Sequence, residues 1–347
     1  MRVRCAKVPL KASDASAIVD LAEEVDAVVL GADGAMWAAR LDTRADELRD
    51  AADVLLNAGD HTAALRLVGS LSRYAQASGR VDEVRALAEW VLAHVSHDVE
   101  PAVRARAQLT TGELAFRQGD QAAATAATQA ALASAESAGD TTTAARAEMN
   151  LARIAFRDGD AVRITRHAER MLELAPHDPA LKPGAVHMLA WAAYTAGEVG
   201  TAIERFQENV ELYRVAGNLV GMASELGNLG DLAAEAGDLD GAAGYLLQAL
   251  DLAQSMNNQY LLPALLASAA TLAAARDRYE ESIELAAAAE RRYALAGLMP
   301  DPSDELSEEV RSRARRAVAP ERAQELEARG EARSLEGAVD LARAALG

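Results

Sequence analysis

Apolar and polar positions follow a helical spacing along most of the chain, in alanine-rich stretches separated by glycines. From Asp42 onwards the pattern is steady, and it predicts one helix over 43–57 and another over 61–78. Beyond Gly79 the predicted helices come in pairs. The first helices of the pairs are expected at about 101–118, 141–158, 180–196, 219–236 and 259–276, and the second helices at about 80–97, 120–138, 160–175, 199–216, 239–256 and 278–296. The pattern therefore predicts an all-α fold.

A short phrase, apolar–x–x–Gly–Asp, returns between the helices. Its turn positions are spaced 40, 40, 38, 40 and 40 residues apart. These positions are Gly79, Gly119, Gly159, Gly197, Gly237 and Asp277. Glycine just after a helix end supplies a left-handed conformation, and the aspartates at Asp120, Asp160 and Asp238 are expected to cap the helices that follow. A fixed period of this size predicts a stacked array, in which function lies on a surface shared by the repeats.

The two ends of the chain depart from the period. Residues 14–29 have a helical pattern, although the β-branched residues within 25–30 also suit a strand. The prolines within 299–304 interrupt the array, and Ser334 is expected to cap the last of the helices beyond them. Those short helices are expected at 305–318, 319–329 and 334–346. We predict an N-terminal adaptor of unassigned structure at 1–41, a helical array at 42–298 and a C-terminal helical cap at 299–347.

Small residues recur at one position of each pair, ahead of the turn. They are Gly112, Ala152, Ala190, Gly230 and Ala270, with Leu151, Leu189 and Leu229 often preceding them. This arrangement resembles the tetratricopeptide repeat, in which small residues let the two helices of a pair approach closely. The resemblance implies a right-handed superhelical solenoid whose first helices line a concave groove.

The longer period of this array resembles the helical domain of LuxR-type and maltose-regulator-type bacterial transcription regulators. Residues 37–41 and 47–51 resemble the start of that domain, and residues 327–330 and 334–339 resemble its closing helix. Those regulators carry an ATPase with a Gly-x4-Gly-Lys-Ser/Thr loop and often a helix-turn-helix, and neither is recognisable here. We expect the chain to correspond to the sensor or interaction part alone.

Composition narrows the classes of partner. The formal net charge of −18 argues against direct nucleic-acid binding and against an anionic membrane surface. Cys5 is the single cysteine, which excludes an internal disulfide and a cysteine-based zinc site. The sequence holds no apolar run long enough for a transmembrane helix, so a cytoplasmic location is expected. We expect no cofactor and no metal. His94 and His97, with Asp98, could ligate a metal, but histidine at a helix end also complements the helix dipole.

Five arginines and four aromatic residues gather at the groove-facing positions of three adjacent repeats. With neighbouring polar residues, the candidate groove comprises Arg106, Glu113, Phe116, Arg117, Arg146, Asn150, Arg153, Phe156, Arg157, His187, Trp191, Tyr194, Asn228 and Asp231. Arginine forks suit carboxylate or phosphate, and aromatic rings supply stacking area. Asn150 and Asn228 are candidates to hold a peptide backbone. The alternative interpretation is that these arginines pair with nearby acids and the aromatics fill space between repeats.

These features favour a non-catalytic binding module. The expected partner is a protein, a peptide or a small anionic ligand in the groove, in a regulatory setting that the family resemblance implies. A first alternative is the ligand-sensing component of a transcription regulator that acts with a separate DNA-binding chain. A second is an enzyme that uses the groove as its active site, although no catalytic motif such as Gly-x-Ser-x-Gly or His-Glu-x-x-His occurs. The sequence leaves homo-oligomerisation open.

Overall fold

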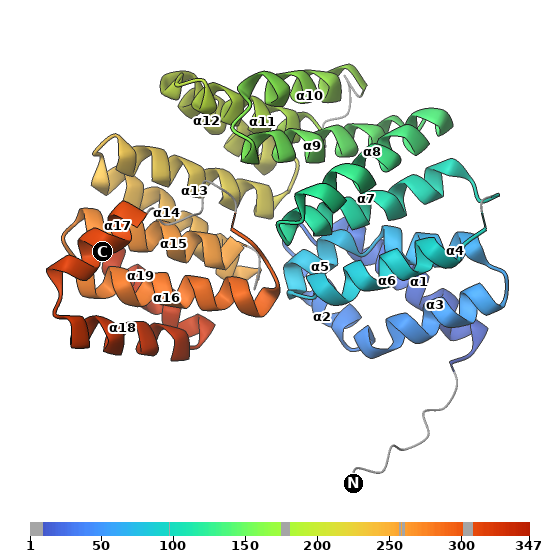
Figure 1. The fold of residues 1–347 in the computed structure, drawn as a ribbon, viewed down its shortest axis with the longest axis horizontal. Helices are drawn as coiled ribbons and strands as arrows, with labels where there is room; N and C mark the ends of the chain where they lie inside the picture. The colour runs from blue at the N-terminus through green and yellow to red at the C-terminus, as the bar shows by residue number, and fades with distance from the viewer. Residues whose placement is uncertain (1–9, 97, 175–180, 257, 259–260, 301–307) are drawn as a thin grey trace, which may run out of the picture.

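The computed structural model describes residues 10–96, 98–174, 181–256, 258, 261–300 and 308–347, which form helices and no strand (Figure 1). The helices are α1 Ala12–Val28, α2 Gly34–Asp42, the 3-10 turn η1 Ala45–Glu47, α3 Leu48–Asn57, α4 His61–Gly69, α5 Ser72–Ser78, α6 Val81–His94, α7 Pro101–Arg117, α8 Gln121–Ala138, α9 Thr141–Arg157, α10 Ala161–Leu174, α11 Lys182–Thr195, α12 Val199–Val215, α13 Leu219–Glu235, α14 Leu239–Ser255, α15 Leu261–Ala275, α16 Tyr279–Ala296, α17 Glu308–Ala317, α18 Pro320–Ala332 and α19 Leu335–Leu346. Neighbouring helices from α7 to α16 pack as consecutive pairs. The predicted all-α solenoid is confirmed.

The recurring turns have the expected backbone. Gly119 and Gly159 adopt φ of 76° and 68°, and Asp277, which replaces the glycine of the last copy, adopts φ of 60°. The following aspartates cap the next helices, because Asp120 accepts a hydrogen bond from the Ala123 amide at 3.1 Å and Asp238 accepts one from the Gly241 amide at 3.0 Å. Each turn thus ends one helix and starts the next within three residues.

The single helix predicted over 61–78 is wrong. The chain forms α4 and α5 instead, with a break at Ser70 and Leu71. Ser70 and the preceding Gly69 both contact α7: the Arg106 guanidinium donates to the Ser70 hydroxyl at 3.2 Å, and the Thr110 hydroxyl donates to the Gly69 carbonyl at 3.4 Å. Contacts with a neighbouring helix therefore favour the break over helix continuation.

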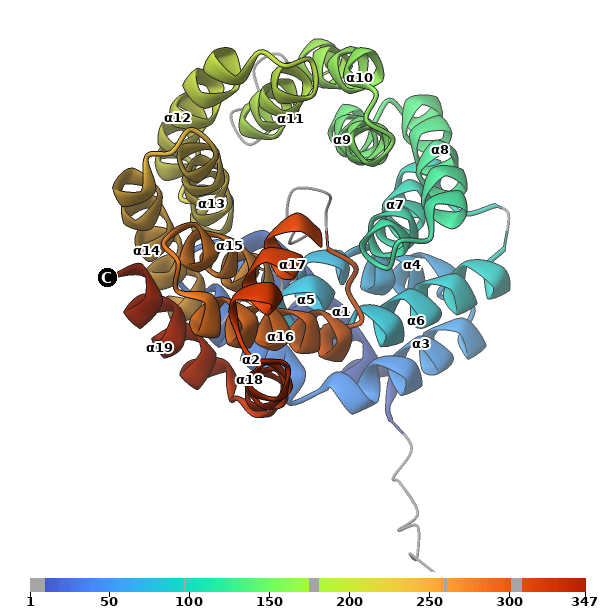
Figure 2. The ribbon, with the colours of Figure 1, turned by 60° about the vertical axis from the view of Figure 1, so that its left-hand side comes forward.

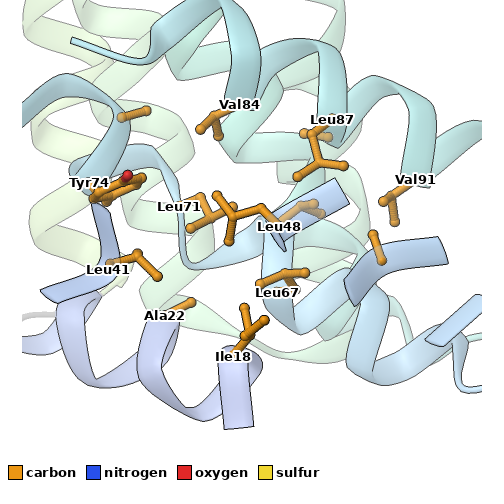
Figure 3. Close-up of a cluster of buried hydrophobic side chains, with 14 of the residues drawn as sticks. Ile18, Ala22, Leu41, Leu48, Leu67, Leu71, Tyr74, Val84, Leu87 and Val91 are labelled. Atoms are coloured by element: carbon orange, nitrogen blue, oxygen red, sulfur yellow. The ribbon is translucent and has the colours of Figure 1, made fainter. Parts of the chain in front are cut away.

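The N-terminal segment forms helices as far as the structure describes it. Residues 12–28 are helical, which decides against the strand considered for 25–30 over that stretch. Ile18 and Val25 are fully buried in a cluster with residues of α3, α4 and α6, and Figure 3 shows Ile18 and Leu67 in that cluster. Residues 1–9 lie outside the described part of the chain.

The first and last helices of the array meet, so the superhelix closes into a ring. The buried cluster of α1, α3 and α6 also contains Tyr293 and Ala296 from the last turn of α16, and Leu298 just beyond that helix. The Met299 amide donates to the Arg117 carbonyl at 2.7 Å, and the Val220 amide donates to the Leu30 carbonyl at 3.3 Å. Figure 2 shows the ring, with α8, α10, α12 and α14 outside and α7, α9, α11, α13 and α15 inside. We call the contact of Tyr293, Ala296 and Leu298 with the N-terminal cluster the ring closure.

The C-terminal helices cover the end of the array. Glu284 of α16 is 2% exposed and pairs with Arg329 at 3.0 Å and with Arg333. The Arg276 guanidinium donates to the Leu346 carbonyl at 2.6 Å. Ser334 caps α19 by accepting from the Gly337 amide at 3.0 Å, as expected. The division of the chain at residues 41 and 298 stays a prediction.

Gly112 and Gly230 both occupy the small-residue position, but we expect them to respond differently to substitution by alanine. A Cβ on Gly112 would lie 2.4 Å from the Thr128 hydroxyl and 3.0 Å from the Thr128 backbone nitrogen. A Cβ on Gly230 would meet Cγ of the buried Leu246 side chain at 2.8 Å and no backbone atom nearer than 3.4 Å, so the close contact there is with a side chain alone. Overpacking costs about 1–3 kcal/mol, against a helix-propensity gain of about 1 kcal/mol for Gly→Ala. We expect Gly112→Ala to lower the free energy of unfolding by about 1 kcal/mol and Gly230→Ala to leave it nearly unchanged in urea titrations.

Equal effects of the two substitutions would contradict this account of the close α7–α8 approach.

Candidate functional site

The inner helices of the ring enclose a cavity of about 250 Å³. Its walls come from α5, α7, α9, α11, α13 and α15, together with Leu30 and Tyr213. From α7 to α15 these are the first helices of successive pairs, which the repeat resemblance places on the concave face. The volume is slightly below the range of about 300–1,000 Å³ typical of small-molecule pockets, so the interior suits a small ligand rather than a folded partner.

Most of the predicted groove residues line this cavity. They are Glu113, Phe116, Arg117, Arg146, Arg153, Phe156, His187, Trp191, Asn228 and Asp231. Because these residues converge on one cavity, the positions counted back from each turn do lie on the inner face of the ring. Their role in binding stays a prediction.

The other four predicted residues lie outside the cavity lining. Arg106 lies 3.6 Å from Asp26, and Asn150 is 1% exposed and donates to the Thr128 hydroxyl at 2.8 Å between α8 and α9. The Arg157 guanidinium stacks on the Phe116 ring at 4.2 Å and donates to the Pro300 carbonyl at 3.4 Å. The Tyr194 hydroxyl donates to Glu235 at 3.2 Å. These contacts link neighbouring helices and segments. They fit the alternative interpretation, in which the arginines pair with nearby acids and the aromatic residues fill space between repeats.

One side of the cavity is basic. We call Arg73, Arg117, Arg146 and Arg153, from α5, α7 and α9, the basic wall. Arg146 pairs with Glu113 at 3.2 Å, and the Ser72 hydroxyl also donates to Glu113. Burial and the positive charges of Arg146 and Arg106 lower the pKa of Arg73, although Asp26 and Glu113 act in the other direction. Burial is the largest cause of this lowering, so Arg73 lies in a largely desolvated part of the basic wall.

Aromatic side chains occupy the middle of the inner face. Trp191 of α11 is 6% exposed, and its ring centroid lies 4.6 Å from that of Phe156 and 5.2 Å from that of Phe206. We call Phe156 and Trp191, which both line the cavity, the aromatic floor. Packing against Phe206 of α12 holds the indole ring in one orientation, so the aromatic floor has a fixed geometry.

The opposite side of the cavity is acidic. We call Glu225 and Asp231 of α13 the acidic wall. Glu225 is fully buried, lies 2.7 Å from Nδ1 of His187, and accepts hydrogen bonds from the amides of Asn209 at 2.9 Å and Asn228 at 3.2 Å. Burial, followed by the charge of Glu225, raises the pKa of Tyr213. The pKa of Tyr213 thus reflects both the burial of this side of the cavity and the negative charge of Glu225.

The positions counted back from each turn glycine do not include every residue that lines the cavity. Three lining residues that they miss are Glu225, Tyr213 and Arg73. A signal for Glu225 was present, because Asn209 stands where the repeat favours alanine and it is the residue that donates to Glu225. Arg73 follows the unpredicted break between α4 and α5, so its orientation could not be counted from a continuous helix.

No cluster of metal-ligating side chains occurs within the described ranges, and His97 lies outside them. Within the same ranges, no helix is both long and apolar enough to span a membrane.

Comparison with known proteins relates this chain to others by fold alone. No family model matches the sequence, and no curated protein matches it. Among solved structures, the fold is similar to that of a Rap protein complexed with Competence and Sporulation Factor, with a TM-score of 0.56 and 12% sequence identity over 82% of this chain and 78% of that one. The apo form of RapI matches 87% of this chain and 85% of its own at 13% identity, with a lower TM-score of 0.46.

Proposed function

We propose that this protein is a non-catalytic receptor for a short, peptide-like ligand with an anionic group, held in the central cavity. The observation that carries the proposal is the convergence of the four arginines of the basic wall beside the aromatic floor. Guanidinium groups bind carboxylates through paired, charge-assisted hydrogen bonds, and the rings offer apolar contact area. The cavity thus combines a charged anchor with a stacking surface.

The arrangement of the polar groups favours binding over catalysis. The Ser72 hydroxyl donates to Glu113, but Ser72 is 1% exposed and does not line the cavity. The His187 ring lines the cavity and is held by Glu225. A nucleophile and its base need to lie within hydrogen-bond reach of each other, and Ser72 and His187 are held by different carboxylates, which fits a preformed binding site.

The comparisons support a receptor of this kind. A Rap protein of similar fold was crystallised with Competence and Sporulation Factor, so a scaffold of this type accommodates a bound factor. The resemblance to the helical domain of bacterial transcription regulators suggests what the bound state does. We propose that ligand binding regulates a separate partner chain, with a DNA-binding chain as the first candidate.

Charge reversal in the basic wall tests the receptor function. We expect Arg153→Glu to lower by at least about tenfold the amount of ligand retained from a pool of free tripeptides and tetrapeptides, because a charge-assisted hydrogen bond contributes about 1.5–3 kcal/mol. Retention is measured by mass spectrometry after the full chain is separated from unbound peptide. Arg153 is half-buried at the cavity and is not a member of the Glu113–Arg146 pair. Because its charge also acts on Glu113, urea unfolding of the variant is compared with that of the unaltered chain.

Arg163→Glu is the matched control, since Arg163 pairs with Asp158 at 2.9 Å on the outer helix α10 and lies outside the cavity lining. If the pool is retained equally by Arg153→Glu, Arg163→Glu and the unaltered chain, the basic wall is not the ligand site.

A further inference from the structure

A buried hydrogen-bond network lies between α11, α12 and α13, behind the surface of the cavity. Nδ1 of His187 lies 2.7 Å from Glu225, and Glu225 is fully buried. Glu225 also accepts hydrogen bonds from the amides of Asn209 at 2.9 Å and Asn228 at 3.2 Å. The Asn209 amide donates to the Pro183 carbonyl at 2.9 Å as well. The network therefore holds Glu225 in place, and Glu225 holds one edge of the His187 ring.

Aromatic packing fixes the plane of the same ring. The His187 centroid lies 6.3 Å from that of Trp191 at an interplanar angle of 83°, and 6.1 Å from that of Phe206 at 61°. Edge-to-face contacts of this kind are favourable between rings. Trp191 belongs to the aromatic floor, so the imidazole of His187 is held beside that floor in one orientation.

The second nitrogen of the ring, Nε2, is accessible at the cavity. Because Nδ1 is turned toward Glu225, Nε2 lies on an edge of the ring that faces away from this carboxylate. Among the residues that the structure describes, Nε2 has no hydrogen-bond partner, and it is not one of the buried polar atoms that lack one. His187 lines the cavity with 16% of its side-chain surface accessible, whereas Val186 and Met188 are buried. A fixed polar atom is therefore available to a ligand.

The proton content of the His187–Glu225 pair decides what Nε2 can bind. Within the described chain, the other hydrogen-bond partners of Glu225 are neutral amides, so His187 is the partner that can compensate a buried negative charge. A pair without net charge is either a carboxylate beside an imidazolium or a carboxylic acid beside a neutral imidazole. In both forms Nε2 carries a hydrogen, so it is a donor.

We propose that His187 is a ligand-binding residue whose Nε2–H donates a hydrogen bond to an uncharged carbonyl oxygen of the ligand, and that Glu225 is the residue that positions it. This inference rests on the proposed receptor function and adds a second group that the ligand must carry. Figure 2 shows α11 between α9 and α13 on the inner side of the ring. A ligand whose anionic group lies against Arg146 and Arg153 of α9 therefore extends past His187, and a peptide backbone supplies carbonyl oxygens at that place.

His187→Asn separates the two contacts of the ring. The asparagine amide can take the place of Nδ1 and donate to Glu225, but no atom of asparagine reaches the place of Nε2. We expect this variant to unfold in urea as the unaltered chain does, and to retain about tenfold less of the pool of tripeptides and tetrapeptides. Equal retention by His187→Asn and the unaltered chain would overturn the role of His187 and leave the receptor function standing. Retention of no peptide by the unaltered chain would overturn both.

His167→Asn is the matched control. Nδ1 of His167 lies 2.6 Å from the buried Glu148, so this is a second histidine–carboxylate pair of the same kind, but neither residue lines the cavity. The control is expected to retain the peptides as the unaltered chain does. A tenfold loss in His167→Asn as well would show that the effect comes from the loss of a histidine–carboxylate pair and not from the cavity, and would overturn the proposal.

The hydrogen on Nε2 is measured directly by nuclear magnetic resonance on the unaltered full chain with ¹⁵N-labelled histidine. The His187 signals are assigned by their absence from the His187→Asn spectrum. We expect Nε2 to carry a hydrogen at neutral pH and its signal to shift when the peptide pool is added. An Nε2 without a hydrogen, or a signal that the retained peptides leave unchanged, would overturn the donor role. This measurement does not depend on the stability of any variant.

Discussion

Replacement of Glu113 by leucine is expected to destabilise the protein by about 3–5 kcal/mol, the loss seen when one partner of a buried ion pair is removed. Glu113 is 9% exposed and receives Arg146 at 3.2 Å and the Ser72 hydroxyl. Without the carboxylate, Arg146 and Arg73 would remain close together in a largely buried place, where their positive charges repel. Equilibrium unfolding in urea measures the loss.

Glu173→Leu is the control for this substitution. Glu173 pairs with Arg170 at 2.9 Å, but its side chain is 66% exposed. Exposed pairs contribute about 0–1 kcal/mol, so this variant is expected to unfold almost as the unaltered chain does. Similar losses in the free energy of unfolding for Glu113→Leu and Glu173→Leu would show that the buried pair contributes no more to stability than an exposed pair.

The pH dependence of stability gives a second measure of the contribution of Glu113. Burial acts to raise the pKa of Glu113, but Arg146, Ser72, Arg153 and Arg73 together lower it below its ordinary value. A group whose pKa is lower in the folded state stabilises the fold above its unfolded pKa, and that stability is lost as the pH falls through the folded pKa. The unaltered chain should therefore lose stability below about pH 4, and Glu113→Gln should show a shallower loss over the same range.

The second large effect is expected at the ring closure. Leu298 is 8% exposed and lies in the same cluster as the N-terminal helices. Leu298→Asp would place a charge in that apolar contact, where burial without a partner is strongly unfavourable. The rest of each helix pair is held by local contacts between neighbours. We therefore expect the ring to open, with a larger radius of gyration in small-angle X-ray scattering and nearly unchanged helix content by circular dichroism.

Leu295→Asp provides the matched control, since Leu295 lies in the last turn of α16, three residues before Leu298, and is 55% exposed. It should keep the radius of gyration of the unaltered chain. If Leu298→Asp also keeps that radius and melts at the same temperature, the end of α16 does not hold the ring together.

The repeat period was sufficient to predict most of the scaffold. Positions counted back from each turn identified Phe116, Arg153 and Trp191 as inward-facing, because the geometry within one helix pair is local and repeats along the chain. The same counting failed between α4 and α5, where contacts with α7 favour a break. Asn150 was added to the groove as a neighbouring polar residue, but its amide lies between α8 and α9, the facing helices of successive pairs.

The remaining differences come from contacts that link distant repeats. Arg157 was expected in the groove, but it contacts Met299 and Pro300, which follow the last repeat. Glu225 receives donors from three different helices. Which distant residues meet depends on the rotation of each helix pair relative to the one before it, added up along the array. Counting positions within a single repeat does not give that total rotation.

The closed ring also limits how this protein can change in evolution. Open solenoids gain and lose repeats readily, because each added unit needs to match only its neighbours. Here Leu30 meets Val220, and Arg117 meets Met299, through direct backbone hydrogen bonds. Duplication or deletion of one helix pair would rotate and displace every element beyond it, and these partners would no longer face each other. The copy number is therefore fixed by the closure, and variation is expected to be concentrated in the side chains of the inner helices.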